Sequence, residues 1–187
     1  MNNYEVVIDD SFEAAIKLIE LNPVVLDFAS STNPGGNWRG NQTGTQEESL
    51  CRRSNLGILL EKRKYPIPRD SLFYIKDVII NKNVNMEPIP NVKIAVIASE
   101  LKGISSSTEQ YLLNRVDELY TTAINNNHGC IILGLWGCGA FCESDDDIII
   151  LARIMKTIRK RYEHLIFTSY AINRKKRKFD TFLQNVQ

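Results

Sequence analysis

The sequence is poor in the residues that most often bind metals. It has two histidines, His128 and His164, and no two of its four cysteines have the Cys-x-x-Cys spacing of a zinc site. This set is a poor fit to a structural or catalytic zinc centre. Cys138 and Cys142 flank a glycine turn and could pair in principle. Without a secretion signal we expect reduced thiols instead.

Signals for export or for membrane insertion are also missing. The first ten residues, MNNYEVVIDD, lack the basic region and the following apolar run of a signal peptide. No apolar stretch reaches the ~20 residues that span a bilayer. The net charge is only +1, which gives no overall electrostatic reason to bind nucleic acid or a membrane. We therefore expect a soluble, intracellular protein, either cytoplasmic or nuclear.

Short apolar runs alternate with segments of helical periodicity. This alternation predicts an α/β or mixed three-layer domain, and a length of 187 residues suits one domain without repeats or linkers. The expected strands are Tyr4–Ile8, Val24–Phe28, Leu72–Ile75, Val78–Ile80, Lys93–Ala98, Cys130–Leu135 and Leu165–Tyr170. The expected helices begin near Ser11, Thr45, Ser105 and Ser144. A basic run, Arg174–Lys178, indicates a solvated tail that could also contact polymer phosphates or nucleic acid.

Two glycine-containing loops follow apolar strands. Ala29–Thr45 follows the strand that ends at Phe28, and Trp136–Cys142 follows the strand that ends at Leu135. Ligands of open α/β sheets bind beyond the carboxyl ends of the strands. Exposed N–H groups at Gly137-Cys-Gly139 make that loop a candidate diphosphate cradle. Neither loop has the spacing of a P-loop or of a dinucleotide fingerprint, so an ordinary structural turn remains the alternative for each.

Glu47 and Glu48 lie at the start of a helix, directly after the long loop. Adjacent glutamates on a helix are usually solvated, and only one of two neighbours faces a given atom. A partly buried carboxyl has a raised pKa, so it can protonate a leaving oxygen and then activate water. Cleavage of a glycosidic bond needs such a group.

These segments together resemble a known family. The stretches Leu26-Asp-Phe-Ala-Ser30, Asn33-Pro-Gly-Gly36, Gln46–Ser54 and Leu133–Phe141 are similar to the microbial-type poly(ADP-ribose) glycohydrolases, a family of macrodomains. The family signature is a triple glycine, six to eight residues and then Gln-Glu-Glu, and eight residues separate Asn37 from Gln46 here. The resemblance covers about 22–170. It implies one macrodomain-like α/β/α domain over 1–187, with a mixed central sheet and a basic tail at 173–187.

The resemblance also implies roles for individual residues. Glu48 matches the catalytic acid–base of ribose–ribose O-glycosidic cleavage, and Glu47 matches a neighbouring glutamate that helps to hold ribose hydroxyls. Gln46 would order the loop or the ligand, and Phe141 would pack against the terminal ribose. The implied ligand-binding residues are Gly35, Gly36, Asn37, Gln46, Gly137, Cys138, Gly139, Ala140 and Phe141. The expected partners are ADP-ribose, poly(ADP-ribose) and ADP-ribosylated proteins, with no metal and no cofactor.

One departure from the family pattern leaves alternatives open. Asn37 stands where the third glycine is expected. Asparagine tolerates left-handed backbone angles, but its side chain could crowd the ligand. The alternatives are therefore an inactive module that binds ADP-ribose, or a hydrolase of a mono-ADP-ribose derivative. Trp38, in the same loop, is as consistent with contact to a ligand or partner as with local packing. The sequence gives no oligomeric state.

Overall fold

The computed structural model describes residues 3–41, 44–139, 144–173 and 176–187, and its centre is one six-stranded sheet. The strand order is β1-β6-β5-β2-β4-β3, and every neighbouring pair is parallel except β3 and β4. The predicted mixed sheet is therefore confirmed. The strands are β1 Tyr4–Val7, β2 Pro23–Phe28, β3 Phe73–Lys82, β4 Pro88–Ser99, β5 Cys130–Leu133 and β6 Phe167–Ala171.

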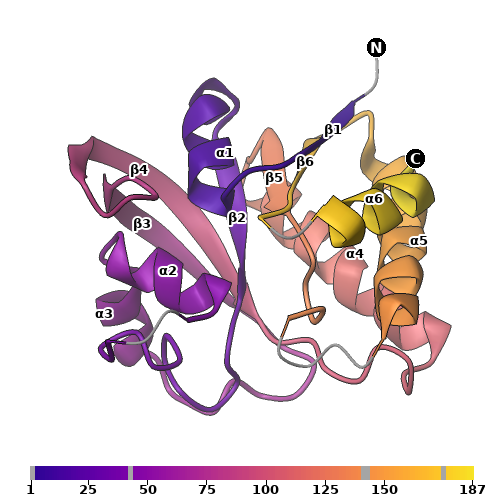
Figure 1. Cartoon of the computed structure of the whole chain (residues 1–187), viewed down its shortest axis with the longest axis horizontal. Coiled ribbons are helices and arrows are strands. Elements are labelled where there is room, and N and C mark those ends of the chain that lie inside the picture. The colour runs from indigo at the N-terminus through magenta and orange to yellow at the C-terminus, as the bar shows by residue number, and fades with distance from the viewer. Residues whose placement is uncertain (1–2, 42–43, 140–143, 174–175) are drawn as a thin grey trace.

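Helices cover both faces of the sheet, which gives the predicted three layers (Figure 1). They are α1 Ser11–Lys17, α2 Gln46–Arg52, α3 Leu56–Glu61, α4 Glu109–Asn125, α5 Asp145–Tyr162 and α6 Lys176–Val186, with a 3-10 turn at Ile19–Leu21. Alternate residues of β2 enter different cores. Val24 and Leu26 pack with α4 and α5, and Val25 packs with α1, α2 and α3. Because both faces are buried, β2 is continuously apolar up to Leu26.

Several elements differ from the predictions, and β4 begins at Pro88 rather than at Lys93. The two short strands predicted at Leu72–Ile80 form one strand, β3, with a register shift between Ile75 and Val78. The helix predicted after Thr45 divides into α2 and α3, because Ser54 pairs with Ile80 and interrupts the helical hydrogen bonds. Within the segment predicted as a basic tail, α6 packs against α5. Among the described residues, no helix has the length and apolar character needed to cross a membrane.

Candidate active site

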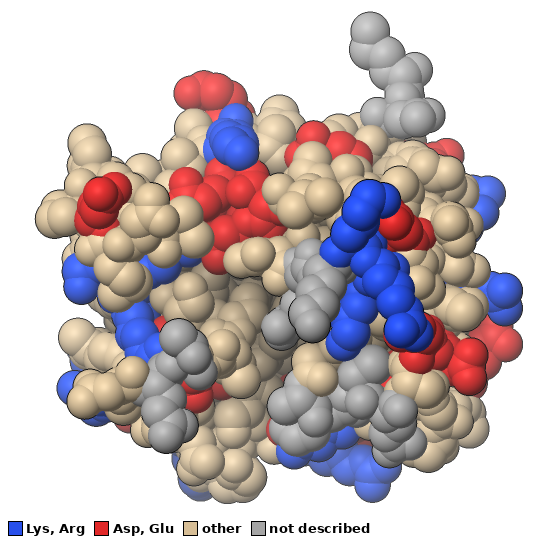
Figure 2. Space-filling view, viewed as in Figure 1, with Lys and Arg blue, Asp and Glu red and all other residues tan. Residues whose placement is uncertain are grey.

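The loops that follow β2, β5 and β6 leave the sheet at the same edge, because these strands are parallel neighbours. A cavity of about 380 Å³ lies at this edge, between the strand ends and the start of α2. Its lining residues are Asp10, Ser11, Phe28, Gly44, Thr45, Gln46, Ser49, Arg52, Met86, Leu135, Ala171, Ile172 and Asn173. In Figure 2, acidic side chains gather beside α1 and basic ones beside α6 on the face that carries this edge. The volume suits a small-molecule ligand.

Gln46 fixes the end of β2 against the start of α2. Its Oε1 accepts a hydrogen bond from the Phe28 N–H at 2.9 Å, and its Nε2 donates to the Leu26 carbonyl at 2.8 Å and to Ser11 Oγ at 3.2 Å. The amide thus continues the hydrogen-bonding pattern of β2 where the strand runs out of partners. These hydrogen bonds connect Gln46 to the end of β2, where the long loop begins.

Glu47 lies under the loop with 2% of its surface exposed. Its Oε2 accepts from the Ser30 N–H at 2.8 Å, and its Oε1 accepts from the Gly35 N–H at 3.1 Å. Burial raises the pKa of Glu47 to about 8, although the N–H groups of Ser30 and Gly35 act in the opposite direction. The fully buried Asp27 lies deeper, and burial together with the charge of Glu47 raises its pKa as well. At neutral pH most of the Glu47 carboxyl therefore keeps its proton.

The contribution of Glu47 to stability should fall as the pH rises from its ordinary pKa of 4.5 to about 8. Over this range the folded state keeps a proton that the unfolded state has lost, so raising the pH favours unfolding. We expect Glu47→Gln to gain stability relative to the wild type between about pH 5 and about pH 8.5. Urea unfolding at both pH values measures this. The exposed Glu20→Gln is the control, and a difference between wild type and Glu47→Gln that does not change with pH would contradict the assignment.

Glu48 lies nearer the surface than Glu47, with its side chain 13% exposed. It forms a capping box with Thr45, whose N–H donates to Glu48 Oε2 at 3.1 Å and whose hydroxyl accepts from the Glu48 N–H. Glu48 Oε1 accepts from the Asn37 N–H at 3.0 Å. The carboxylate is thereby held between the two ends of the Asn37–Thr45 segment, and it is the more accessible member of the glutamate pair.

Because Gly44 has no side chain, the Glu48 carboxylate can lie directly against its Cα atom. A Cβ atom at this position would lie 1.2 Å from Glu48 Oε2, so Gly44→Ala must displace the carboxylate. Gly44 is exposed, and we therefore expect Gly44→Ala to fold while any activity that uses the Glu48 carboxylate falls by about 100-fold or more. Initial rates on the substrate that the family resemblance implies measure the effect, with Asn41→Ala in the same loop as the control. Activity near that of the wild type would show that the Glu48 position is not needed.

The left-handed backbone angles of the loop lie at Gly35 and Gly36, with φ of 72° and 60°. Asn37 is absent from the residues described with positive φ, so the turn needs no third glycine. A Cβ atom at Gly40 would lie 2.6 Å from Asn37 Nδ2, which places the Asn37 side chain against Gly40, within the loop. The tolerance of asparagine for left-handed angles is therefore not called on at Asn37.

Trp38 packs locally. A Cβ atom at Gly57 would lie 2.4 Å from the indole, so the ring lies directly against the backbone of α3, and Trp38 Nε1 donates to Glu61 at 3.2 Å. Arg52 donates to the carbonyls of Trp38 and Asn37 at 2.8 and 3.1 Å, and its guanidinium is 3.8 Å from Glu48. Together these contacts fasten the loop to α2 and α3.

The second loop is anchored in the core. Gly137 has φ of 75°, and a Cβ atom there would lie 3.0 Å from the Leu101 carbonyl. Cys138 is fully buried and its N–H donates to the Leu135 carbonyl, so this N–H is not free for a phosphate. Gly139 is exposed. Two predicted ligand residues, Ala140 and Phe141, lie outside the described residues.

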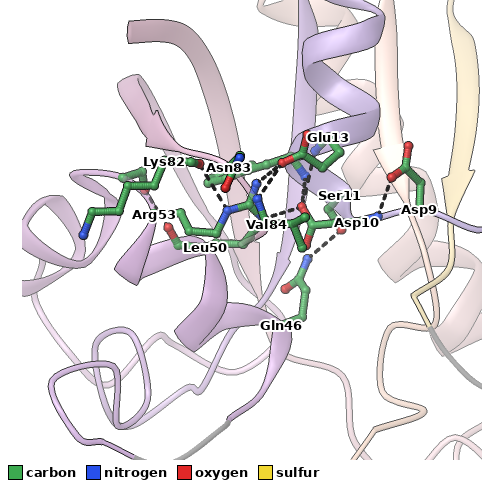
Figure 3. Close-up of polar contacts among 12 residues, drawn as sticks. Asp9, Asp10, Ser11, Glu13, Gln46, Leu50, Arg53, Lys82, Asn83 and Val84 are labelled. Atoms are coloured by element: carbon green, nitrogen blue, oxygen red, sulfur yellow. Dashed lines mark hydrogen bonds and ion pairs between the residues drawn. The ribbon is translucent and has the colours of Figure 1, made fainter. Parts of the chain in front are cut away.

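The sequence reasoning missed an ion-pair network that joins α1 to α2 (Figure 3). Arg53 is fully buried, and its guanidinium contacts Asp10 at 2.6 Å, Glu13 and the carbonyl of Lys82. Asp10 also caps α1. The partners lie about 40 residues apart in the sequence, so no local pattern reveals them.

In the described part of the chain, no group of three or more His, Cys, Asp or Glu residues is placed to hold a metal ion.

Comparison with known proteins shows what the chain is similar to. The family described as "Microbial-type PARG, catalytic domain" matches residues 1–86, which contain the long loop and Gln46–Glu48. No curated protein sequence matches the chain. The resemblance to the microbial-type poly(ADP-ribose) glycohydrolases is therefore confirmed by the family match.

Two solved structures show how far the fold extends. The poly(ADP-ribose) glycohydrolase of Deinococcus radiodurans, in complex with ADP-ribose, has a TM-score of 0.80 at 22% identity, covering 98% of this chain and 84% of that chain. The poly(ADP-ribose) glycohydrolase of Thermomonospora curvata, bound to the inhibitor ADP-HPD, has a TM-score of 0.82 at 20% identity, covering 97% and 78%. These likenesses confirm the macrodomain-like fold. The family match over residues 1–86 supports the predicted class, a hydrolase of the poly(ADP-ribose) glycohydrolase type, and the solved structures show the fold of that class.

Proposed function

We propose that this protein cleaves the ribose–ribose O-glycosidic bonds of poly(ADP-ribose) and releases ADP-ribose. The observation that carries the proposal is the pair Glu47 and Glu48 at the start of α2. The Glu47 carboxyl is buried under the loop, whereas the Glu48 side chain is 13% exposed and lies between Thr45 and Ser49 in the sequence, two residues that line the cavity. The family match over residues 1–86 and the likeness to two poly(ADP-ribose) glycohydrolases support the substrate class.

Glu48 is the proposed acid–base. It donates a proton to the ribose oxygen that leaves, while the C–O bond breaks and an oxocarbenium-like centre develops on the other ribose. Glu48 then takes a proton from the water that attacks this centre, so the carboxyl ends the cycle protonated. Glu47 is a poor candidate for this step, because only 2% of its surface is exposed and backbone N–H groups occupy both of its oxygens.

Glu47 acts on the substrate ribose mainly through the backbone that it holds. By accepting from Ser30 and Gly35, it fixes the loop on which ribose hydroxyls would rest. The loop glycines Gly35 and Gly36, the segment Gly137–Gly139 and the neighbouring Ala140 and Phe141 are the proposed contacts to the diphosphate and the terminal ribose. Release of ADP-ribose from purified polymer tests the function, with a protein-linked single ADP-ribose as the parallel substrate.

A binding module without catalysis is the second candidate, because Asn37 replaces a loop glycine. Asn37 donates its N–H to Glu48, and its side chain lies against Gly40. We therefore expect Asn37→Gly to change the turnover of polymer by less than about fivefold, equivalent to the ~1 kcal/mol that the added freedom of a glycine costs. Steady-state kinetics measure this. A large gain in turnover would show instead that Asn37 impairs the loop and would favour the binding module.

An intracellular location is part of the proposal. Cys51 and Cys130 are buried free thiols, as is common in reducing compartments. Proposed partners are ADP-ribosylated proteins, and any nucleic acid would contact the basic residues at the start of α6. Lys176 and Arg177 already pair with Asp180 and Asp145, which weakens their attraction for a polyanion.

A further inference from the structure

A second cavity lies at the same edge of the sheet, beyond the glutamate pair. It has a volume of about 340 Å³ and lies at the end of β4 and the start of β3. It shares no lining residue with the first cavity. Its lining residues are Ser31, Ile67, Pro68, Arg69, Asp70, Ser71, Glu100, Lys102, Tyr111 and Arg115.

One peptide unit separates this cavity from the glutamate pair. The Ser30 N–H donates to Glu47 at 2.8 Å, and the next N–H, of Ser31, donates to Glu100 at 3.2 Å. Glu47 belongs to the glutamate pair, and Glu100 lines the second cavity. The first cavity meets the opposite end of the same loop, at Gly44. A ligand whose reacting bond lies at Glu48 can therefore extend to either side of the loop.

The lining has the chemistry of a nucleotide site. Tyr111 offers an aromatic ring beside the apolar Ile67 and Pro68, and aromatic rings stack on nucleobases. Arg69 and Lys102 bring cationic groups that pair with phosphate. The side chain of Arg69 is 90% exposed and that of Lys102 is 48% exposed, so both can reach a ligand at the rim.

Each of the two acidic residues that line the cavity lies close to a basic residue that also lines it. Glu100 pairs with Lys102 at 2.7 Å and accepts from the Ser31 N–H, and Asp70 lies 3.7 Å from Arg69. These contacts reduce the repulsion that the carboxylates would exert on a phosphate.

The floor of the cavity is rigid. Arg115 is 4% exposed and donates to Ser99 Oγ at 2.6 Å and to Glu118 at 2.6 Å. Its Nε is buried and has no hydrogen-bond partner among the described residues, so this wall keeps an unused donor.

We propose that this second cavity binds the nucleotide unit on the leaving side of the cleaved bond, that is, the next ADP-ribose of the polymer. The inference rests on the proposed function, because only a polymer has a nucleotide there. It deepens that function by assigning a preference for polymer over a single ADP-ribose attached to protein. The leaving ribose carries both a base and a diphosphate, which match Tyr111 and the two rim cations.

Binding measurements test the proposal without turnover. Calorimetry on Glu48→Gln protein compares ADP-ribose with the dimer, two ADP-ribose units joined by the ribose–ribose bond. We expect the dimer to bind about tenfold more tightly, the gain of one stacked base. Tyr111→Ala and Arg69→Ala should each remove much of this gain and leave the affinity for ADP-ribose unchanged. Lys160→Ala, an exposed cation on α5, is the matched control and should change neither affinity.

The outcomes separate this proposal from the proposed function. Equal affinities for dimer and ADP-ribose, or equal losses for both ligands in the two variants, would overturn the second site. Arg69→Ala keeps the test decisive if Tyr111→Ala fails to fold, since Arg69 is highly exposed. A dimer preference that depends on Arg69, in wild-type protein that cannot cleave polymer, would support the site and reject the glycohydrolase. If neither ligand binds, both proposals fail.

Discussion

Replacing Glu48 by glutamine should slow the release of ADP-ribose from poly(ADP-ribose) by about 100- to 10,000-fold, the usual contribution of a general acid–base. Glutamine has nearly the same shape and can keep one arm of the capping box with Thr45, but it has no proton to give to the leaving oxygen. The loss should therefore appear in kcat, whereas the affinity for ADP-ribose should change little. Initial rates on purified polymer and calorimetry with ADP-ribose measure the two quantities.

The control for this variant is a glutamate in the first turn of another helix. Glu109→Gln in α4 makes the same chemical change on an exposed surface and should be fully active. Comparable rates for Glu48→Gln and wild type would remove Glu48 from the mechanism. A loss of ADP-ribose affinity as large as the loss of rate would make Glu48 a binding residue instead.

Replacing Arg53 by methionine should lower the free energy of unfolding by about 3–5 kcal/mol, because it leaves buried carboxylates without their cation. Asp10 is only 9% exposed, and it would lose its contact with Arg53 at 2.6 Å. Arg53 also donates to the carbonyl of Lys82, so β3 loses a link to α2. Since α2 carries Glu47 and Glu48, activity should fall together with stability. Urea unfolding and polymer turnover measure these effects.

A triple variant separates a broken ion pair from lost packing. Arg53→Met combined with Asp10→Asn and Glu13→Gln removes the charges together, and replacing a whole buried ion network is often close to neutral. We expect this triple variant to be clearly more stable than Arg53→Met alone. Arg153→Ala, an exposed arginine of α5, serves as the surface control. If Arg53→Met matched the stability of this control, the network would have no structural role.

The local signals of the sequence were sufficient for most of the fold. Continuous apolar runs marked β2 and β5, because strands buried on both faces carry apolar side chains at nearly every position. The division between α2 and α3 could not be predicted from the sequence. It depends on Ser54 pairing with Ile80, and it also depends on Asn55, whose side chain accepts from the Ile79 N–H at 2.8 Å. Contacts between residues about 25 apart leave no periodic trace.

The sequence also predicted only some features of the candidate site. Gln46, Glu47 and Glu48 were found from their order after a glycine loop, but the order alone could not show which glutamate is sealed. That depends on the N–H groups of Ser30 and Gly35, which only the folded loop directs at Glu47. The sequence also could not show the backbone angle of Asn37, since φ at each loop position is set by the packing around it, and in the folded loop φ of Asn37 is not positive.

The central claim is that this chain releases ADP-ribose from poly(ADP-ribose) through Glu48. Its most direct test is to incubate purified protein with polymer of defined length and to quantify free ADP-ribose over time, beside Glu48→Gln. We predict that ADP-ribose accumulates as the polymer shortens, and that the variant is slower by at least about 100-fold. Intact polymer in the presence of wild-type protein that binds ADP-ribose would contradict the claim and leave a binding module.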